Sequence, residues 1–363
     1  ENIKRIENIS KTKKKSDLKI PDILLFLPKF ILILDNQKNI FYIIQHVDFK
    51  NNSSLHFEDL KSNIQSLKQE FSKNTKFKEM NFKKKIKVNI KSNISKKNFI
   101  KNINIAKKYI KNGDIFQVVP SQRFETKYTG SVLKLYQALR KTNPSPFMYY
   151  FNFPRFKIVG SSPEILVRLR NKKITIRPIA GTRPRGKTKK LDNKYAEDLL
   201  KDKKEIAEHL MLLDLGRNDI GRVANKSSVK VTSEFEIERY SHVMHIVSNV
   251  EGKVSSDKTA FEALMAGFPA GTVSGAPKIR AMQIIDELEN TKRGIYAGGI
   301  GYITSDGEMD TCIALRTGII SNNTLFVQAG GGVVYDSDPN KEYEETVNKA
   351  KALFNAAEIA IAN

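Results

Sequence analysis

The sequence has only one cysteine, no tryptophan and too few acidic residues to balance its lysines. A single thiol cannot form a disulfide within the chain, which favours a reducing compartment such as the cytoplasm. Cys312 also lacks the glycine-rich surroundings of a nucleophile elbow, so we interpret it as a small strand residue.

Long hydrophobic runs are missing as well. The longest apolar stretch, residues 23–34, contains Pro28 and Lys29 and is far shorter than the roughly 20 apolar residues of a membrane-spanning helix. It is followed by the polar turn Asp35-Asn36-Gln37, and we predict two strands there. The first residue is Glu1 and no signal-peptide pattern follows, so the sequence is expected to lack part of an N-terminal region.

The shortage of acidic residues leaves a formal net charge of +23, with 62 Lys and Arg against 39 Asp and Glu. A strongly basic chain raises the possibility of nucleic-acid binding. The lysines are spread along the chain, however, and cluster only at 11–15, 83–87 and 187–190. None of these clusters is interleaved with base-stacking aromatics, so a basic nucleic-acid-binding protein is only the alternative from another class.

The chain changes character near residue 95. Residues 1–95 are rich in Lys and Asn and end in a polar connector or edge strand, whereas 96–363 read as one large folded domain. Strand patterns in that second part occur at 115–120, 147–153, 157–159, 174–176, 229–232, 242–250, 298–304, 311–319 and 324–329. Helical patterns occur near 60–71 and at 99–110, 193–214, 260–265, 277–288 and 341–362. Antiparallel strands with intervening helices predict an α+β fold.

Two predicted helices carry paired acids. Glu205 and Glu208 are three residues apart, as are Glu342 and Glu345, and Lys349 continues the stripe of the second pair. Acids in a first helical turn can simply favour the helix dipole. The functional alternative is a Mg²⁺ site, because this hard cation takes one or two carboxylates together with substrate oxygens.

Other segments leave a structural and a functional interpretation open. Three glycines at 330–332 follow a strand, and their amides could cradle a carboxylate or merely form a tight turn. Arg316 lies within an apolar strand pattern and needs a partner, either a ligand carboxylate or a structural acid. His245 lies in another strand, where a core role competes with proton transfer.

These pieces occur together in one family. Residues 96–360 resemble the chorismate-utilising enzymes, which comprise anthranilate, aminodeoxychorismate, isochorismate and salicylate synthases. The similarity is carried by ten ordered runs: DIFQVVPS (114–121), GSSPE (160–164), PIAGTRPRG (178–186), EHLMLLDL (208–215), RND (217–219), VMH (243–245), PAGTVSGAPK (269–278), YAGG (296–299), ALRT (314–317) and EYEET (342–346). The family implies two large packed antiparallel sheets with helices outside and one deep site between them.

The resemblance assigns roles to the candidate residues. Glu208 and Glu345 are expected to ligate Mg²⁺, with Glu342 and Glu205 nearby, and the metal would bind the ring carboxylate of chorismate. The expected substrate-binding residues are Gly181, Thr182, Tyr296, Arg316, Ala329, Gly330, Gly331, Gly332 and Lys349. Glu164 matches the family's general acid and His245 the group that assists loss of the C2 proton and pyruvate. Thr272 lines the ring pocket and, with Gln117, completes the catalytic set.

Two positions choose among the branches of the family. Isochorismate and salicylate synthases resemble each other in a lysine where this chain has Gln117; that lysine activates water, which a glutamine cannot do. Aminodeoxychorismate synthases typically have a nucleophilic lysine where this chain has Ala180. Both positions match the anthranilate synthases, which convert chorismate and ammonia to anthranilate and pyruvate. An aminodeoxychorismate synthase is the alternative within the family.

The same resemblance bears on regulation and partners. One half of the family's tryptophan feedback site is matched by Asn143, Pro144, Ser145, Pro146, Phe147 and Met148, but the usual Leu-Leu-Glu-Ser run near the N-terminus is absent. Glutamine hydrolysis needs a cysteine nucleophile paired with histidine. Cys312 lies four residues before Arg316, in the predicted chorismate site, so a separate glutaminase subunit is expected to supply ammonia.

Overall fold

The computed structural model describes residues 3, 7, 9, 14, 18–47, 57–73, 80–240 and 243–363. The chain divides into two compact units, one made of Glu1–Asp22 with Asn81–Asn363 and the other of Ile23–Met80. The boundary predicted at residue 95 falls inside the larger unit, just before helix α2 (Lys96–Lys111).

The smaller unit contains a hairpin and a helix. Strands β1 (Phe30–Asp35) and β2 (Ile40–Gln45) pair antiparallel, and α1 (Phe57–Ser72) follows. Of the two strands predicted at 23–34, only the second forms; residues 23–29 have no regular structure. Pro28 has no amide hydrogen for a ladder, which explains why the first strand is missing.

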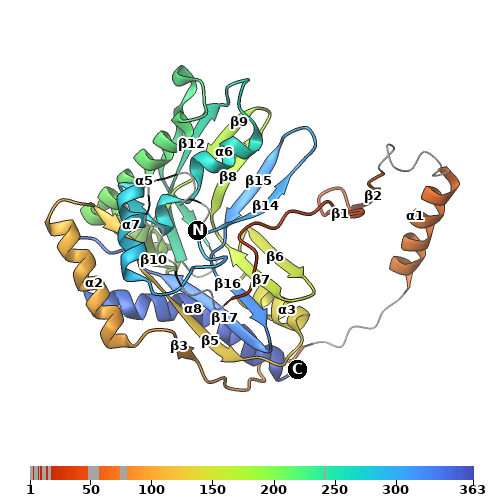
Figure 1. Cartoon of the computed structure of the whole chain (residues 1–363), viewed down its shortest axis with the longest axis horizontal. Coiled ribbons are helices and arrows are strands. Elements are labelled where there is room, and N and C mark those ends of the chain that lie inside the picture. The colour runs from red at the N-terminus through yellow and green to blue at the C-terminus, as the bar shows by residue number, and fades with distance from the viewer. Residues whose placement is uncertain are drawn as a thin grey trace. The chain divides into compact units, whose positions relative to one another are not determined.

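A six-stranded antiparallel sheet forms half of the larger unit, and Figure 1 shows helix α8 (Pro339–Ile361) lying along it. A second helix, α3 (Val132–Thr142), packs on α8 and on the same sheet. In spatial order the strands are β3 (Lys91–Ser92), β5 (Ser121–Lys127), β17 (Thr324–Gly330), β16 (Thr317–Ser321), β7 (Lys157–Ser162) and β6 (Phe147–Asn152).

A seven-stranded antiparallel sheet forms the other half. Its strands are β10 (Ile179–Pro184), β12 (Val243–Lys253), β9 (Lys173–Ile176), β8 (Ile165–Arg170), β15 (Met309–Ile313) and β14 (Gly299–Ile303), with β11 (Lys230–Arg239) paired to β12. Three helices pack on this sheet, namely α4 (Lys189–Lys201), α5 (Lys203–Gly221) and α6 (Ala260–Gly267). A short turn of helix, η2 (Lys226–Ser228), precedes β11.

The two sheets meet through an apolar cluster. Cys312 of β15 packs with Tyr149, Phe156 and Ile158, which lie on or beside the strands of the other sheet. Cys312 is 1% exposed, and burial raises the pKa of its thiol to about 12, as expected for a structural strand residue. Two packed antiparallel sheets with helices outside confirm the predicted α+β fold.

Several short elements lie in the connections between the strands of the two sheets. Strands β4 (Gln117–Val118) and β13 (Gly275–Ala276) pair with each other, and between α6 and β13 lies a short turn of helix, η3 (Gly271–Val273). Helix α7 (Lys278–Leu288) packs its buried face against α2 around Phe99 and Ile103. Val118 belongs to the same apolar cluster, so this packing supports the β4–β13 pair.

Two sequence predictions need correction. The single strand predicted at 311–319 is two strands in different sheets, because the chain turns at Arg316, whose φ is +47°. The single helix predicted at 193–214 is α4 and α5, separated by Asp202, which ends one helix and caps the start of the other. Strands β5, β8 and β10 and helix α3 were not predicted as elements.

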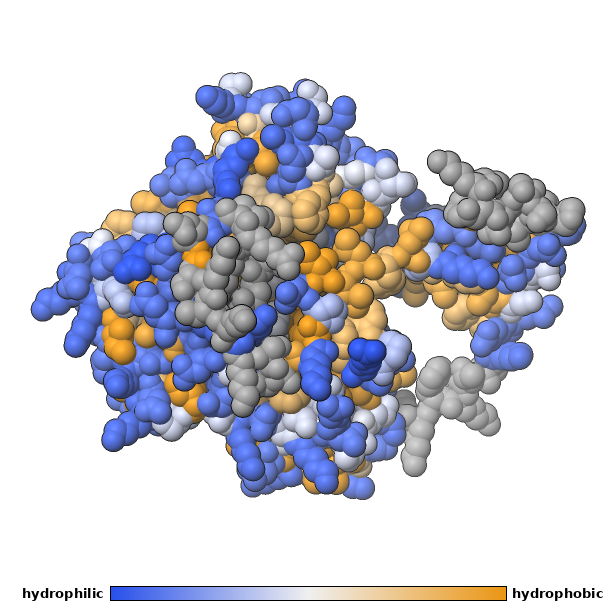
Figure 2. Space-filling view, viewed as in Figure 1, coloured by the Kyte–Doolittle hydropathy of each residue, from blue (hydrophilic) through white to orange (hydrophobic). Residues whose placement is uncertain are grey.

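The described helices include none that is long and apolar enough to cross a bilayer. Hydrophilic residues cover most of the visible face of the larger unit (Figure 2). This distribution agrees with lysines that are spread along the chain.

Candidate active site

The paired acids come from the starts of two capped helices. The Asp202 carboxylate accepts hydrogen bonds from the amides of Lys204 and Glu205 at the start of α5. Asp338 does the same for Asn340 and Lys341 at the start of α8. These caps fix where each helix begins and therefore which way its first-turn glutamates point.

Each of the four glutamates has a different surrounding. Glu208 Oε1 accepts a hydrogen bond of 2.9 Å from Gln117 Nε2, which joins α5 to β4. Glu205 pairs with Arg183 at 3.1 Å, and Glu345 pairs with Lys349 at 2.6 Å along α8. Glu342 Oε2 is buried and has no hydrogen-bond partner in the part of the chain that the structure describes.

The acids influence one another across the two helices. Burial is the main cause that raises the pKa of Glu208, and the charges of Glu205 and Glu345 raise it further. Burial likewise raises the pKa of Glu342, and Glu345 adds to it. No group of three His, Cys, Asp or Glu among the described residues is gathered tightly enough to form a metal cage. The acids are therefore close enough to repel one another, but they do not form a closed metal cage.

The glycine run, the three glycines at 330–332, lies close to Glu342, Gln117 and the Tyr296 hydroxyl. A Cβ on Gly331 would lie 3.1 Å from Glu342 Oε2, and one on Gly332 would lie 2.8 Å from Gln117 Nε2. A Cβ on Gly330 would lie 2.7 Å from the Tyr296 hydroxyl. Side chains at these positions would fill the space in front of the acids, so the glycines keep that space open. Ala329, at 5% exposure, precedes them in β17.

Two cationic side chains, Lys349 and Arg316, act on the same carboxyl group, that of Glu164. Lys349 Nζ donates a 3.0 Å hydrogen bond to the Gly330 carbonyl. Arg316 occupies the turn between β15 and β16, and burial lowers the pKa of its guanidinium although Glu164 opposes this. An arginine whose charge is destabilised by burial is suited to bind a carboxylate in its planar fork.

Glu164 lies between β7 and β8 and is 7% exposed. Burial raises the pKa of its carboxyl to about 8, and Thr272, Lys349 and Arg316 each offset part of that rise. The Thr272 hydroxyl faces this carboxyl but is buried without full hydrogen-bonding geometry to any described partner. Glu164 is therefore a protonated carboxylic acid at neutral pH, which is the state a general acid requires.

His245 lies on β12 beside the bulge of β10 that carries Gly181 and Thr182. Its Nδ1 is 2.7 Å from the Gly181 carbonyl and 3.2 Å from the Thr182 hydroxyl. Burial lowers the pKa of the imidazole, while the contact with Gly181 raises it. The net direction favours the neutral ring, which can accept a proton.

The structure groups the candidates into neighbouring sets: the acids with Gln117 and the glycine run, Glu164 with Thr272, and His245 with Gly181 and Thr182. The charges of Arg316 and Lys349 act on both Glu164 and His245.

The candidate feedback residues follow the end of α3 and continue into the first two residues of β6. Asn143 caps the end of α3, its carbonyl accepts a hydrogen bond from Ser161, and Phe147 joins the apolar cluster around Cys312.

Some residues of this region were missed in the sequence. Arg183 binds Asp198, Asp202 and Glu205 at once and anchors the α4–α5 junction to β10. Arg293 and Glu289 form a buried ion pair behind Tyr296. Arg183 is part of the PIAGTRPRG run (178–186), so the sequence offered a signal that could have identified it. Arg293, in a Lys-Arg-Gly sequence, has the pattern of an exposed loop.

Comparison with known proteins adds an independent result. The family model described as chorismate binding enzyme matches residues 1–355. Anthranilate synthase component 1 of Cereibacter sphaeroides is 62% identical over 271 residues, which cover 75% of this chain and 54% of that protein. The Aquifex aeolicus protein of the same name is 51% identical over 345 residues, covering 93% of this chain and 69% of that protein.

A solved structure gives the same result for the fold. The crystal structure of anthranilate synthase component I from Streptococcus pneumoniae superposes with a TM-score of 0.89 at 40% identity, covering 97% of this chain and 78% of that chain. The chain therefore spans between about half and three-quarters of the length of these relatives.

Proposed function

The chain belongs to the family of chorismate binding enzymes, and from that premise we propose that it is the chorismate-converting component of an anthranilate synthase. The reaction consumes chorismate and ammonia and releases anthranilate, pyruvate and water. Proteins named anthranilate synthase component 1 at 62% and 51% identity support this proposal. A cytoplasmic location is part of the proposal, because the chain has one buried cysteine and no disulfide.

The observation that carries the proposal is the separation of charge within the site. Glu208 and Glu342 lie against the glycine run and form no salt bridge among the described residues, whereas Arg316 and Lys349 supply positive charge near Glu164. Chorismate has two carboxylates, one on its ring and one on its enolpyruvyl group. A divalent cation held by the acids would receive the ring carboxylate, while Arg316, Tyr296 and the amides of residues 329–332 would receive the enolpyruvyl carboxylate.

The acids fit a magnesium ion. Glu342 Oε2 is buried without a hydrogen-bond partner among the described residues, and burial raises the pKa of both Glu208 and Glu342. A hard cation would supply the positive charge that these two carboxylates lack. Glu208 and Glu345 would hold the ion, with Glu342 and Glu205 close by. When bound, it would neutralise the ring carboxylate and orient the ring.

Glu164 would donate its proton to the 4-hydroxyl group, which leaves as water. Its raised pKa keeps the carboxyl protonated at neutral pH. Gly181, Thr182 and Thr272 line the ring pocket, and the unpartnered Thr272 hydroxyl can bond to a ring substituent. In the second step the neutral His245 would assist removal of the C2 proton as pyruvate departs and the ring becomes aromatic.

The nucleophile is proposed to be ammonia. Gln117 Nε2 is engaged with Glu208, whereas Gln117 Oε1 is buried without a partner in the described chain. This carbonyl oxygen can accept a hydrogen bond from ammonia, but an amide cannot deprotonate water. Ala180, which is 8% exposed, has no amine for covalent attack, and this disfavours the aminodeoxychorismate synthase alternative.

Ammonia would come from a glutaminase partner. The buried Cys312 thiol, whose pKa burial raises to about 12, is unsuited to act as the cysteine nucleophile of glutamine hydrolysis. Tryptophan as a feedback inhibitor is also proposed, on the six residues from Asn143 to Met148 alone.

One assay tests the function directly. The purified chain is incubated with chorismate, Mg²⁺ and ammonium at raised pH, and anthranilate is followed by its blue fluorescence. We expect anthranilate with ammonium and none with glutamine alone. Isochorismate, salicylate or aminodeoxychorismate as the main product would contradict the proposal, as would sustained glutamine-dependent turnover with contaminating glutaminase excluded.

A further inference from the structure

Arg293 is a buried arginine that belongs to none of the proposed substrate or metal contacts. It lies in the loop between α7 and β14, and its side chain is only 16% exposed. Its guanidinium donates to the Val273 carbonyl at 2.8 Å and to the Val119 carbonyl at 2.6 Å. Its Cζ lies over the Tyr296 ring, 5.3 Å from the ring centre.

Each of these contacts is close to a proposed site residue. Val273 follows Thr272, and Val119 is two residues after Gln117. The two carbonyls lie just beyond the paired strands β4 and β13, where Gly275 is opposite Val118. A single guanidinium therefore clamps the ends of this strand pair and supports the Tyr296 ring from behind.

The Tyr296 contact extends to the glycine run. The Gly330 amide hydrogen-bonds to the Tyr296 hydroxyl, and the Gly330 carbonyl accepts from Lys349. Displacement of Tyr296 would therefore also move the amides that are proposed to hold the enolpyruvyl carboxylate.

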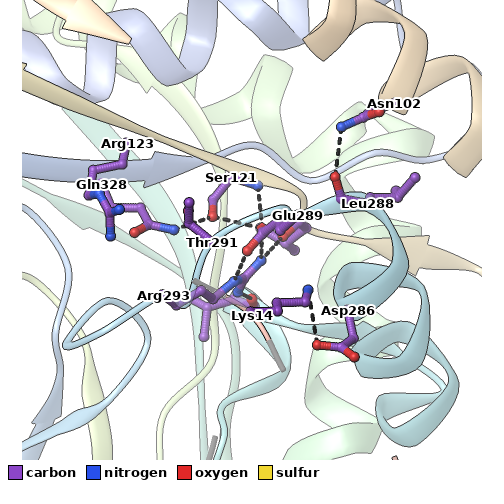
Figure 3. A network of polar contacts seen from close by, with 12 residues as sticks. Lys14, Asn102, Ser121, Arg123, Asp286, Leu288, Glu289, Thr291, Arg293 and Gln328 are labelled. Atoms are coloured by element: carbon purple, nitrogen blue, oxygen red, sulfur yellow. Dashed lines mark hydrogen bonds and ion pairs between the residues drawn. The ribbon is translucent and has the colours of Figure 1, made fainter. Parts of the chain in front are cut away.

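The arginine is itself fixed by a polar network, which Figure 3 shows around Glu289. Glu289 accepts from Arg293 Nε at 2.9 Å and from Arg293 Nη2 at 2.6 Å. It also accepts from the amide and the hydroxyl of Ser121, both at 2.8 Å, and Gln328 donates to that hydroxyl. Burial opposes the charge of Arg293, but the Glu289 carboxylate more than compensates, so the pKa of the guanidinium is raised.

We propose that Arg293, held by Glu289, is a positioning residue that sets the mutual placement of Gln117, Thr272 and Tyr296 for chorismate without touching the substrate. This inference rests on the proposed function, because it assumes that these three residues form the chorismate site. The planar fork is essential, since a lysine could keep the charge but could not bond two divergent carbonyls and two carboxylate oxygens together.

The test compares Arg293→Lys with the wild-type chain. Chorismate affinity is measured by equilibrium dialysis with Mg²⁺ and no ammonium, kcat by anthranilate fluorescence, and Tm by circular dichroism. We expect Kd for chorismate to rise at least fivefold and kcat to fall roughly 10- to 100-fold, because small misplacements of reacting groups have effects of that size. Removing a buried charge can also unfold a protein, so the double variant Glu289→Met with Arg293→Met is tested as well, since it leaves no unpaired charge.

Leu135→Ala is the matched control for lost stability. Leu135 is fully buried on α3, which packs on α8, β6 and β7, whereas Arg293 lies between α7 and β14. It should lower Tm while leaving Kd and kcat within twofold of the wild-type values.

Three outcomes decide between the proposals. If the wild type makes anthranilate and both Arg293 variants keep Kd and kcat within twofold, the positioning role is wrong. Losses of equal size in Leu135→Ala at equal Tm would also overturn it. If the wild type binds chorismate but makes no anthranilate, the proposed function is wrong, and the Kd of Arg293→Lys still decides the positioning role.

Discussion

The two sides of the site differ in how the protein treats its own charges. On the acidic side, Glu205 and Glu345 have cationic partners, whereas Glu208 accepts from the amide of Gln117 and one oxygen of Glu342 has no hydrogen-bond partner among the described residues. On the basic side, Arg316 is charged although burial lowers its pKa. The protein thus leaves opposite charges incompletely compensated a short way apart. Such an arrangement is costly alone and becomes favourable when a ligand supplies both countercharges.

The largest effect on the Mg²⁺ dependence of turnover is expected from removing one acid of α8. Glu345→Gln should lower turnover about 1,000-fold at low Mg²⁺, because the variant would lose one of the two carboxylates proposed to hold the ion. Isothermal titration with Mg²⁺ should show weakened binding in the same variant. The matched control is Glu344→Gln, one residue earlier on the same helix, since Glu344 is exposed and binds Lys96. Near-normal activity of Glu345→Gln at low Mg²⁺ would mean that α8 does not hold the metal.

The opposite side is tested at Arg316. Arg316→Gln should reduce kcat/KM for chorismate about 100-fold, since a neutral side chain cannot replace a buried charge-assisted contact. Mg²⁺ binding without chorismate should change little. Arg168→Gln on β8 is the control, because Arg168 forms a solvent-accessible pair with Asp310. If Arg316→Gln weakened Mg²⁺ as much as chorismate, the two sides would not be independent.

Glu164 belongs to neither the acidic nor the basic side of the site. Its protonation should be visible in how the stability of the protein depends on pH. Its pKa is about 8 in the folded chain and about 4.3 unfolded, so stability falls as pH rises from near 4 to near 8. Glu164→Gln should abolish the first step. Because glutamine does not titrate, the free energy of unfolding of the variant should also exceed that of the wild type by a few kcal/mol more at pH 8 than at pH 4, on the order of the shift in pKa. Thermal unfolding of both proteins at the two pH values measures this. Equal pH dependence would indicate an ionised Glu164.

His245 is examined with the aminated intermediate. His245→Gln should convert chorismate to aminodeoxyisochorismate but aromatise it about 100-fold more slowly, in the range expected for loss of a general base. Because burial lowers the pKa of the imidazole, wild-type aromatisation should decline only below the pH range where an ordinary histidine titrates. Conversion of added intermediate at the wild-type rate would leave His245 with a structural role only.

The smallest effect is expected at the boundary between the two sides. Gly331→Ala places a Cβ 3.1 Å from Glu342 Oε2, and a shift of that carboxylate should weaken Mg²⁺ roughly three- to tenfold, as expected for about 1 kcal/mol of overpacking. Gly221→Ala meets no atom within 4 Å and is the control. Equal Mg²⁺ affinity in both variants would indicate that the glycine run does not limit the space near the acids.

The residues that the sequence predicted best are those whose chemistry depends on local spacing. Glu205 with Glu208 and Glu342 with Glu345 could be placed on helix faces from their spacing, and a family resemblance linked the two helices. The role of Arg316 stays a prediction, but the single strand predicted around it was wrong. An apolar run contains no signal that predicts a residue with positive φ at the point where the chain passes from one sheet to the other.

Elements with buried polar residues were harder to predict. Strand β5 begins with Ser121, Gln122 and Arg123, all buried, so its sequence looks like an exposed loop. Their partners are distant in sequence, such as Glu289 for Ser121 and Thr346 for Gln122. Hydrogen bonds of this kind depend on tertiary structure, and no local pattern carries them. Helix α3 is different: it was missed, although the N-cap Ser131 and the spacing of Leu135 and Leu139 are a local pattern that would have predicted it.

The change of sheet at Arg316 has a consequence for how the protein folds. Strand β15 pairs within one sheet and β16 within the other, so the backbone around Arg316 adopts its position only when both sheets have assembled. Metal and substrate should therefore bind the fully assembled chain and ignore partly folded forms. Each ligand would then act as a selective stabiliser of the completed fold, raising the unfolding temperature in proportion to the logarithm of its concentration.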